Sequence, residues 1–299
     1  MAPQTRPPAT PSPSATLIPL RNGSTGMEVY LTRRSAASSF MPGTYVFPGG
    51  NLEPEDTDTA FWQNHVDLPV EQLVRALGGT LDQMLPVAVA AIRETWEEAG
   101  MLLAVPKARL GAVGRFESGG IPFNRRVAEH NLCLRISELG CWHHWITPVR
   151  MPQRFDTFFF VAPVPQDQTG RPDNQETVHA VWVTPRQALT ENLRGSLPLS
   201  PPTLVTLHQM LEFGTLAELL AETRGRPWPP PIMPRLWPLE AGALIVEPWD
   251  PDYNRRTVQV DPARLEQAVL PVGAPFSRLW RHGGICRPVR AERERAEGG

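Results

Sequence analysis

Hydrophobic and polar residues follow two patterns along the chain, one typical of strands and one typical of helices. Short runs rich in β-branched and aromatic residues, bounded by turn residues, predict strands. These runs lie at residues 15–20, 27–32, 45–47, 111–116, 132–134, 155–162 and 178–183. Apolar residues at helical spacing predict helices at 57–65, 70–77, 85–103, 184–189, 201–213 and 215–223. Strands interleaved with helices indicate an α/β domain with a mixed sheet.

Proline divides the chain into three parts. Prolines are frequent in residues 1–14, and this composition predicts a disordered N-terminal arm. Residues 15–223 carry the predicted strands and helices and form one domain. Prolines dominate again over residues 224–237, so residues 224–299 are predicted to be a proline-rich extension that packs on the domain or on a partner chain. The extension is compatible with a homodimer.

Charge and cysteine content narrow the functional classes. The formal net charge of −2 gives no global field that would attract nucleic acid or an anionic membrane, so neither is expected as a partner. Cys133, Cys141 and Cys286 form no even disulfide framework and match no common zinc module. No secretory signal and no membrane-spanning run is visible in the sequence. We therefore expect a cytoplasmic protein.

The most informative stretch of sequence is a cluster of carboxylates in the third predicted helix. Glu94, Glu97 and Glu98 are spaced i, i+3 and i+4, so their side chains share one helix face. Like charges at this spacing repel one another, and a divalent cation relieves the repulsion. Hard carboxylate oxygens suit Mg²⁺ or Mn²⁺, which bind them together with substrate phosphates. Arg93 adjoins the cluster and can fix a carboxylate rotamer. On its own, an acidic triplet is more often a solvated surface.

The residues around this cluster resemble the Nudix box. Its glycine and first acid correspond to Gly50 and Asp56, and the remainder to the stretch from Arg93 to Gly100. An insertion, roughly residues 57–85, separates the two halves. The resemblance implies the Nudix α/β/α sandwich with a mixed sheet and a helical insertion inside the box.

One Nudix branch carries such an interruption, the coenzyme A diphosphatases of the peroxisomal type and their bacterial relatives. The sequence from Leu31 to Gly50 is similar to the signature that precedes the box in that branch, with Ser39 where an arginine is usual. Segments around Trp145, Phe155 and Trp182 are also similar. The resemblance implies a hydrolase that splits coenzyme A or acyl-coenzyme A into adenosine 3′,5′-bisphosphate and (acyl)phosphopantetheine.

The resemblance also implies roles for individual residues. Expected metal ligands are Gly50 (through its carbonyl), Glu94, Glu97, Glu98 and Asp56. Glu53 is an outer candidate, and Arg93 is expected to orient the carboxylates. The general base is either a box glutamate or an acid on a distant loop, and Glu176 is the loop candidate. Each of these side chains could instead be solvated surface.

Cationic and aromatic residues supply the candidates for substrate binding. Arg33, Arg34 and Arg154 can meet phosphates with two hydrogen bonds each. Phe155, together with Trp142, Trp145 and Trp182, can stack an adenine or line a pantetheine groove, although aromatic residues on strands more often belong to a core. Two alternatives stay open, a Nudix hydrolase of another nucleotide (a nucleoside diphosphate-sugar, a dinucleotide or a triphosphate) and a Nudix module that senses a nucleotide without cleaving it.

Overall fold

A mixed sheet forms the centre of the molecule, which is described here from a computed structural model over residues 8–107, 121–165, 167–173, 176–255 and 260–291. Within these ranges the strand order is β3-β2-β1-β8-β7, with β4 paired to β1 and β9 paired to β2. The strands are β1 (Ser12–Gly23), β2 (Gly26–Arg34), β3 (Tyr45–Val46), β4 (Gly49–Asn51), β7 (Gly140–Ile146), β8 (Phe155–Pro163) and β9 (Thr177–Val183). Strands β1 and β8 run parallel, and the other pairs are antiparallel.

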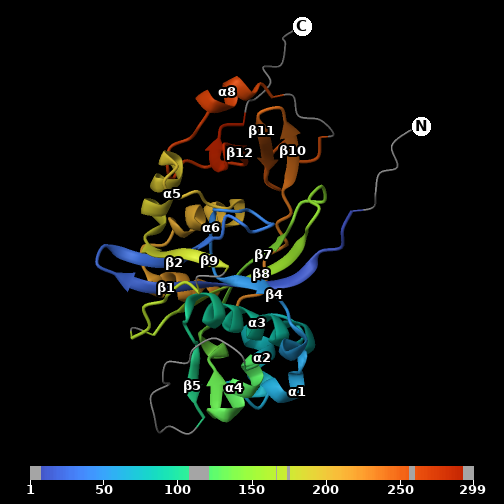
Figure 1. The fold of residues 1–299 in the computed structure, drawn as a ribbon, viewed down its shortest axis with the longest axis vertical. Helices are drawn as coiled ribbons and strands as arrows, with labels where there is room; N and C mark the ends of the chain where they lie inside the picture. The colour runs from blue at the N-terminus through green and yellow to red at the C-terminus, as the bar shows by residue number, and fades with distance from the viewer. Residues whose placement is uncertain (1–7, 108–120, 166, 174–175, 256–259, 292–299) are drawn as a thin grey trace, which may run out of the picture.

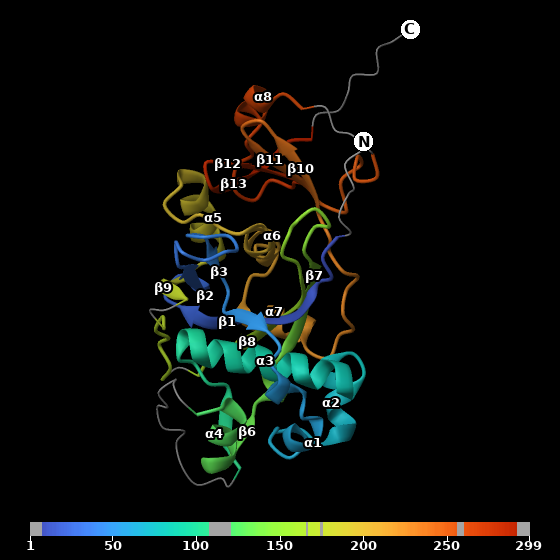
Figure 2. The ribbon, with the colours of Figure 1, turned by 45° about the vertical axis from the view of Figure 1, so that its right-hand side comes forward.

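Helices cover both faces of this sheet. On one face lies the long helix α3 (Leu81–Ala99), with α1 (Thr59–Trp62) and α2 (Val70–Leu77) beside it. On the other lie α5 (Pro185–Arg194), α6 (Pro201–Met210) and α7 (Leu216–Thr223). Figures 1 and 2 show α3 below the sheet and α5 and α6 above it. The predicted α/β/α sandwich is confirmed.

Strand β1 shows why the sheet lies between two cores. Ala15 and Leu17 face the core that contains α3, whereas Ile18 and Leu20 face the core that contains α5 and α6. Both faces are buried, so the strand reads as a continuous apolar run rather than an alternating one. The strand begins at Ser12, earlier than predicted, because residues 12–14 pair with β8. The predicted disordered arm is therefore too long at its C-terminal end.

The box insertion folds against α3. Helix α2 has its predicted bounds, but the expected helix at 57–65 is a short 3₁₀ turn (Pro54–Thr57) followed by the single turn α1. Helix α3 begins at Leu81 and ends at Ala99, four residues before each predicted limit. It ends there because Gly100 takes the left-handed conformation, with φ of 65°, and its amide caps the carbonyl of Trp96.

A small subdomain follows α3. It contains β5 (Ala104–Pro106), α4 (Phe123–Glu129), β6 (Leu132–Leu134) and a 3₁₀ turn (Ile136–Glu138). Strand β6 matches its prediction. The strand predicted at 111–116 lies outside the described residues. Strand β7, which was not predicted as a strand, pairs with β8 and completes that edge of the main sheet.

The C-terminal extension forms a second sheet. Residues 226–232 run along the domain in extended form, where Trp228 donates its indole N–H to the Leu77 carbonyl and Ile232 pairs with β7. An antiparallel meander follows, built from β10 (Arg235–Leu239), β11 (Gly242–Val246), β12 (Arg278–His282) and β13 (Ile285–Val289), with α8 (Pro262–Gln267) against it. The prediction of a proline-rich extension missed this sheet. The extension packs on its own chain.

The two faces of the C-terminal sheet have different neighbours. Leu236, Ile245 and Leu279 point into the core shared with α5 and α6. Leu244 and Trp280 point the other way, into a small core closed by α8. A buried hydrogen bond of 2.8 Å from the Asn192 side chain on α5 to the Cys286 carbonyl on β13 adds to this attachment. The C-terminal sheet is thus held firmly against the main domain.

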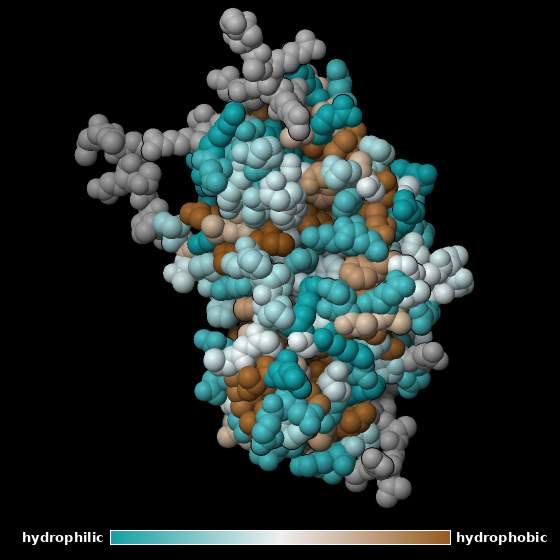
Figure 3. Space-filling model, turned by 180° about the vertical axis from the view of Figure 1, so that it is seen from behind, coloured by the Kyte–Doolittle hydropathy of each residue, from teal (hydrophilic) through white to brown (hydrophobic). Residues whose placement is uncertain are grey.

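The outer surface of the molecule is mixed in character. Seen from behind, hydrophobic side chains are interspersed with hydrophilic ones (Figure 3). Among the helices of the described ranges, none has the length and apolar composition that a membrane crossing requires.

Candidate active site

The three carboxylates of the predicted box lie together on the last two turns of α3. Glu98 is 5% exposed, while the side chains of Glu94 and Glu97 are 14% and 38% exposed. On the face that meets β4, the exposure of the three acids therefore increases from Glu98 through Glu94 to Glu97.

Two glycines of β4 allow the backbone to approach these acids. A Cβ atom at Gly50 would lie 2.5 Å from Oε1 of Glu94, so a side chain at this position would displace that carboxylate. The amide of Gly49 donates to Oε2 of Glu98 at 3.2 Å. Gly50 therefore lies where the resemblance expects it, against the acidic face of α3.

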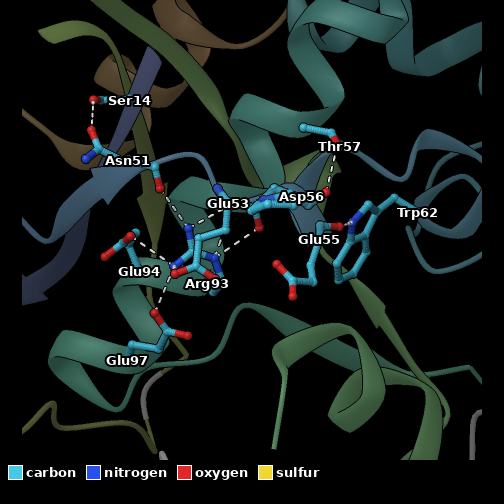
Figure 4. Close-up of polar contacts among 11 residues, drawn as sticks. Ser14, Asn51, Glu53, Glu55, Asp56, Thr57, Trp62, Arg93, Glu94 and Glu97 are labelled. Carbon is cyan, nitrogen blue, oxygen red and sulfur yellow. Dashed lines mark hydrogen bonds and ion pairs between the residues drawn. The ribbon is translucent and has the colours of Figure 1, made fainter. Parts of the chain in front are cut away.

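Arg93 connects the acids to the start of the insertion (Figure 4). It is 2% exposed and donates to both oxygens of Asp56, with Nε–Oδ1 at 3.0 Å and Nη2–Oδ2 at 2.8 Å. Its Nη1 donates to Glu94 and Glu97 at 2.9 Å each, and its Nη2 donates to the Asn51 carbonyl at 2.9 Å. One guanidinium thus contacts two carboxylates of α3 as well as Asp56.

Asp56 has a different position from the one expected of a metal ligand. It is 1% exposed, both its oxygens accept from Arg93, and Oδ2 also accepts from the Glu53 amide at 2.8 Å. Both oxygens thus contact Arg93. Asp56 is therefore placed to hold Arg93, and its expected role as a metal ligand stays a prediction.

Burial and mutual repulsion raise the pKa values of the acids on α3. The pKa of Glu94 rises to about 7, chiefly through burial, with Arg93 lowering it and Glu97 and Glu176 raising it. Burial, and then the charge of Glu94, holds the pKa of Glu98 well above its ordinary value. This cluster carries more negative charge than Arg93 alone can balance at low cost.

The donor set fits a hard divalent cation. Glu94, Glu97 and Glu98 each use one carboxylate oxygen in a hydrogen bond, and the other oxygen has no partner among the described residues. Within the described ranges, no three acidic, histidine or cysteine side chains already converge on one point. Arg93 holds Glu94 and Glu97 in their present positions, so small side-chain rotations would be needed to gather the free oxygens around a cation.

A cavity of about 440 Å³ opens beside the acids. Its lining at one end includes Gly50, Glu94 and Glu176, and its lining elsewhere includes the first turn of α6 and three residues of the C-terminal sheet. The cavity therefore extends from the carboxylate cluster to the second sheet. Its size is suited to a small organic ligand.

The structure separates the four predicted substrate-binding residues into two groups. Arg34 and Phe155 line the cavity, and Phe155 packs edge-on against Phe40. Arg33 does not line it, because its guanidinium turns to the Gly43 carbonyl and the Tyr45 ring. Arg154 is 8% exposed and donates to the carbonyls of Thr147 and Ala9, so it braces the β7–β8 hairpin. Of the four residues, Arg33 and Arg154 thus do not line the cavity, and the substrate-binding roles of all four stay predictions.

Glu176 lines the same cavity. Its side chain is exposed, and its charge acts on both Glu94 and Glu98. The Glu176 carbonyl accepts from the Ser35 amide at 2.8 Å, which fixes the loop beside β2. The structure therefore brings this distant acid close to the carboxylates of α3.

The predicted aromatic residues also fall in different places. Trp142 and Trp145 both belong to the core, and of the two only Trp145 also lines the cavity. Trp182 packs on Tyr30 and under Arg21, outside the cavity. Sequence reasoning missed Arg281 of β12, which lines the cavity from the far sheet. The available signal was its place two residues after the core residue Leu279, on the same strand face.

A mixed sheet between helices, with a glycine turn pressed against an Arg-Glu-x-x-Glu-Glu helix, defines a Nudix-type protein. Residues 4–210 match the family model described as the NUDT19 Nudix domain, so the chain belongs to that family of the Nudix superfamily. The superfamily and the coenzyme A diphosphatase branch, predicted from the sequence, are both confirmed.

Individual relatives agree with this assignment. The chain is 29% identical to the acyl-coenzyme A diphosphatase NUDT19 of Xenopus laevis over 67% of this chain and 63% of that protein. It is 27% identical to the protein of the same name from Gallus gallus, over 84% and 81% of the two chains. The crystal structure of a Nudix hydrolase from Alicyclobacillus acidocaldarius superposes with a TM-score of 0.60 at 26% identity, covering 73% of this chain and 99% of that chain. The chain thus spans under two thirds of the frog protein.

Proposed function

We propose that this protein is a divalent-metal-dependent hydrolase of coenzyme A or acyl-coenzyme A, releasing adenosine 3′,5′-bisphosphate and (acyl)phosphopantetheine. The observation that carries this proposal is the cavity of about 440 Å³ that joins the acids of α3 to Arg34 and to an apolar wall. The names of the frog and chicken relatives support the choice of substrate.

Mg²⁺ or Mn²⁺ is the proposed cofactor, held by the Gly50 carbonyl and by Glu94, Glu97 and Glu98. The free oxygens of the three carboxylates and the close approach of Gly50 support this set. When bound, the cation supplies positive charge to the substrate diphosphate. Arg93, anchored by Asp56, fixes the rotamers of Glu94 and Glu97 so that they need little reorganisation.

The other side chains of the site have separate tasks. Arg34 points its guanidinium to the loop at 38–40 and lines the cavity, so we assign it to hold a phosphate oxygen of the substrate. Glu176 is assigned to accept the proton of the attacking water, because it is an exposed carboxylate beside the acids of α3. Phe155 and Phe40 exclude water from one wall. The free cysteines support the cytoplasm as the proposed location.

The test is a substrate panel with product masses. Purified protein with Mg²⁺ or Mn²⁺ is offered coenzyme A, acetyl-coenzyme A, ADP-ribose, a diadenosine polyphosphate and the common triphosphates. We expect phosphopantetheine products, and we expect Glu98→Gln to lower kcat by about 10²- to 10³-fold. Glu55→Gln is the matched control, since the side chain of Glu55 is exposed and has no hydrogen bond to any described residue, while its backbone carbonyl accepts from Trp62.

Three other results would change the assignment. Cleavage of a different member of the panel keeps the hydrolase and replaces the substrate. Binding without cleavage favours a nucleotide-sensing module. Full activity in Glu98→Gln would remove the acids of α3 from the mechanism.

The role of Glu176 is tested separately. Glu176→Gln should lower kcat by about 10²-fold with KM nearly unchanged. A kcat of the variant close to that of the wild type would move the general base to a glutamate of α3.

A further inference from the structure

The C-terminal sheet presents one cation on an otherwise apolar inner face. Leu236, Ile245 and Leu279 fill that face and join the core shared with α5 and α6. Arg281 lies two residues after Leu279 on β12, so its side chain leaves the same face of the sheet. Leu236, Ile245 and Arg281 all line the cavity, and these are the residues through which the second sheet reaches it.

Arg281 has no hydrogen bond and no ion pair with any side chain in the part of the chain that the structure describes. The contrast with Arg278, three residues earlier, is clear, because Arg278 is bound by Asp250 at 2.8 Å and also by Asp252. A half-buried guanidinium that faces a cavity without a partner is suited to a ligand anion. Phosphate is the anion that its planar set of donors matches best.

The first turn of α6 adds positive potential beside this cavity. Residues 200–203 line the cavity, and α6 has ten residues, so the positive end of its dipole faces the same space. Pro201 and Pro202 lack amide hydrogens, and the Thr203 amide already donates to Ser200. The helix therefore favours an anion there without supplying donors, and a side chain such as Arg281 has to supply them.

The charges that line the cavity are divided between two places. Glu53, Glu94 and Glu176 lie at the end next to α3, and the cationic residues among the described lining are Arg34 and Arg281. Arg34 acts on Glu98 and so belongs to the end with the acids. Arg281 comes from the other sheet. A substrate with a diphosphate and a second, separate phosphate matches this division.

We propose that Arg281 binds the 3′-phosphate of the adenosine half of the substrate, which makes the C-terminal sheet part of the substrate site. The inference rests on the proposed function, because coenzyme A carries this phosphate in addition to its diphosphate. The adenosine half then lies toward the C-terminal sheet and the scissile diphosphate lies at α3. Arg281 acts as a specificity residue for the 3′-phosphate and takes no part in bond cleavage.

The experiment compares coenzyme A with 3′-dephospho-coenzyme A in the full-length protein. We expect Arg281→Gln to lower kcat/KM for coenzyme A by about 10- to 100-fold and to change kcat/KM for the dephospho substrate by less than about threefold. Arg281→Lys should recover part of the loss. Arg287→Gln is the matched control, because Arg287 lies on β13 opposite Trp280, on the outer face.

A binding measurement makes the test independent of catalysis. Calorimetry without metal should show that Arg281→Gln weakens the binding of adenosine 3′,5′-bisphosphate by the same factor. The affinity for AMP should be unchanged. The assignment of Arg281 would be overturned if kcat/KM fell equally for both substrates, or if the affinity for both nucleotides fell equally. If the wild-type protein cleaves neither substrate, the proposed function fails, and the two nucleotides still report whether Arg281 recognises a 3′-phosphate.

Discussion

The two halves of the molecule each bury an arginine against an aspartate. In the Nudix half, Arg93 and Asp56 are 2% and 1% exposed, and in the C-terminal sheet Arg278 and Asp250 are both 4% exposed. The contacts beyond each pair differ. Arg93 goes on to hold Glu94 and Glu97, whereas Arg278 goes on to Asp252, and Asp250 accepts from Ser277.

The two buried pairs therefore have different roles: one positions the acids of the site, and the other only joins two segments of the C-terminal sheet. In the Nudix half, the buried pair leaves a guanidinium nitrogen free to fix the acids that face the cavity. In the C-terminal sheet, the pair joins the turn after β11 to the start of β12 and has no contact with the acids. Breaking the two pairs should therefore give similar losses of stability and unequal losses of activity.

The largest expected effect comes from Asp56→Asn and Asp250→Asn. Each variant leaves a buried arginine with a weaker partner, so each should lose about 3 kcal/mol of unfolding free energy. This value lies near the lower end of the range for a broken buried ion pair, because each arginine keeps its other partners. Urea unfolding measures this loss. Activity is then assayed under conditions in which both variants are folded. It should fall at least about tenfold in Asp56→Asn and stay near the wild-type value in Asp250→Asn.

Two outcomes would remove the distinction. Equal activity losses would mean that the C-terminal pair also positions the site. Full activity in Asp56→Asn would mean that Arg93 fixes the acids of α3 without its anchor.

A second comparison sets the two glycines of β4 against each other. The three atoms nearest to a Cβ at Gly50 belong to the flexible end of Glu94, so Gly50→Ala should displace that carboxylate with little effect on stability. A Cβ at Gly49 would lie 2.5 Å from the Ala15 carbonyl and 2.8 Å from the Cα of Thr16, both backbone atoms. Gly49→Ala should therefore lose stability, by about 1–3 kcal/mol.

Activity and melting temperature together check this pair of variants. Gly50→Ala should lower kcat by about 100-fold, as expected for a misplaced catalytic group, at nearly unchanged melting temperature. If Gly50→Ala instead lowers the melting temperature strongly, and its activity falls only as far as the folded fraction does, Gly50 is a packing residue only.

What the sequence predicted well depends on local pattern. The acids of α3 could be placed on one helix face because helical spacing alone brings Glu94, Glu97 and Glu98 together. Strand β1 could be found because both its faces are apolar. The end of α3 at Ala99 was missed by four residues because the apolar run continues past Gly100, where the backbone turns left-handed.

What it predicted poorly depends on contacts distant in sequence. Arg34 and Arg154 look alike in the sequence, yet only Arg34 reaches the cavity, since Arg154 is taken up by the carbonyls of Thr147 and Ala9. Strands β10 and β13 were not predicted because both contain prolines, which are unusual within strands. Strands β11 and β12 pair with each other although α8 lies between them in the chain, and a local sequence pattern does not reveal such a pairing.

The smallest expected effect concerns a carboxyl in the C-terminal half that has no arginine. Glu247 is fully buried, and neither of its oxygens has a hydrogen-bond partner in the described part of the chain. Burial raises its pKa from 4.5 to about 8. Arg278 lies on the neighbouring strand, paired with Val246, but its Nε and Nη2 donate to Asp250 and Asp252.

The raised pKa of Glu247 gives the sign of a pH dependence. Below pH 4.5 the group is protonated in the folded and the unfolded chain, so its contribution to stability is fully present. Between pH 4.5 and about 8 the folded chain keeps the proton and the unfolded chain loses it, so stability falls as pH rises. The slope is roughly 1.4 kcal/mol per pH unit at most, and it levels off above that range.

Glu247→Gln should abolish this slope and be more stable than the wild type at pH 8, by about 2 kcal/mol or less after relaxation around the site. Urea unfolding at pH 5, 6.5 and 8 measures it, with Glu240→Gln as the control at an exposed turn of the same sheet. A parallel pH dependence in wild type and Glu247→Gln would show that Glu247 finds a polar partner in solution. The contrast between the two halves would then rest on the pairs of Asp56 and Asp250 alone.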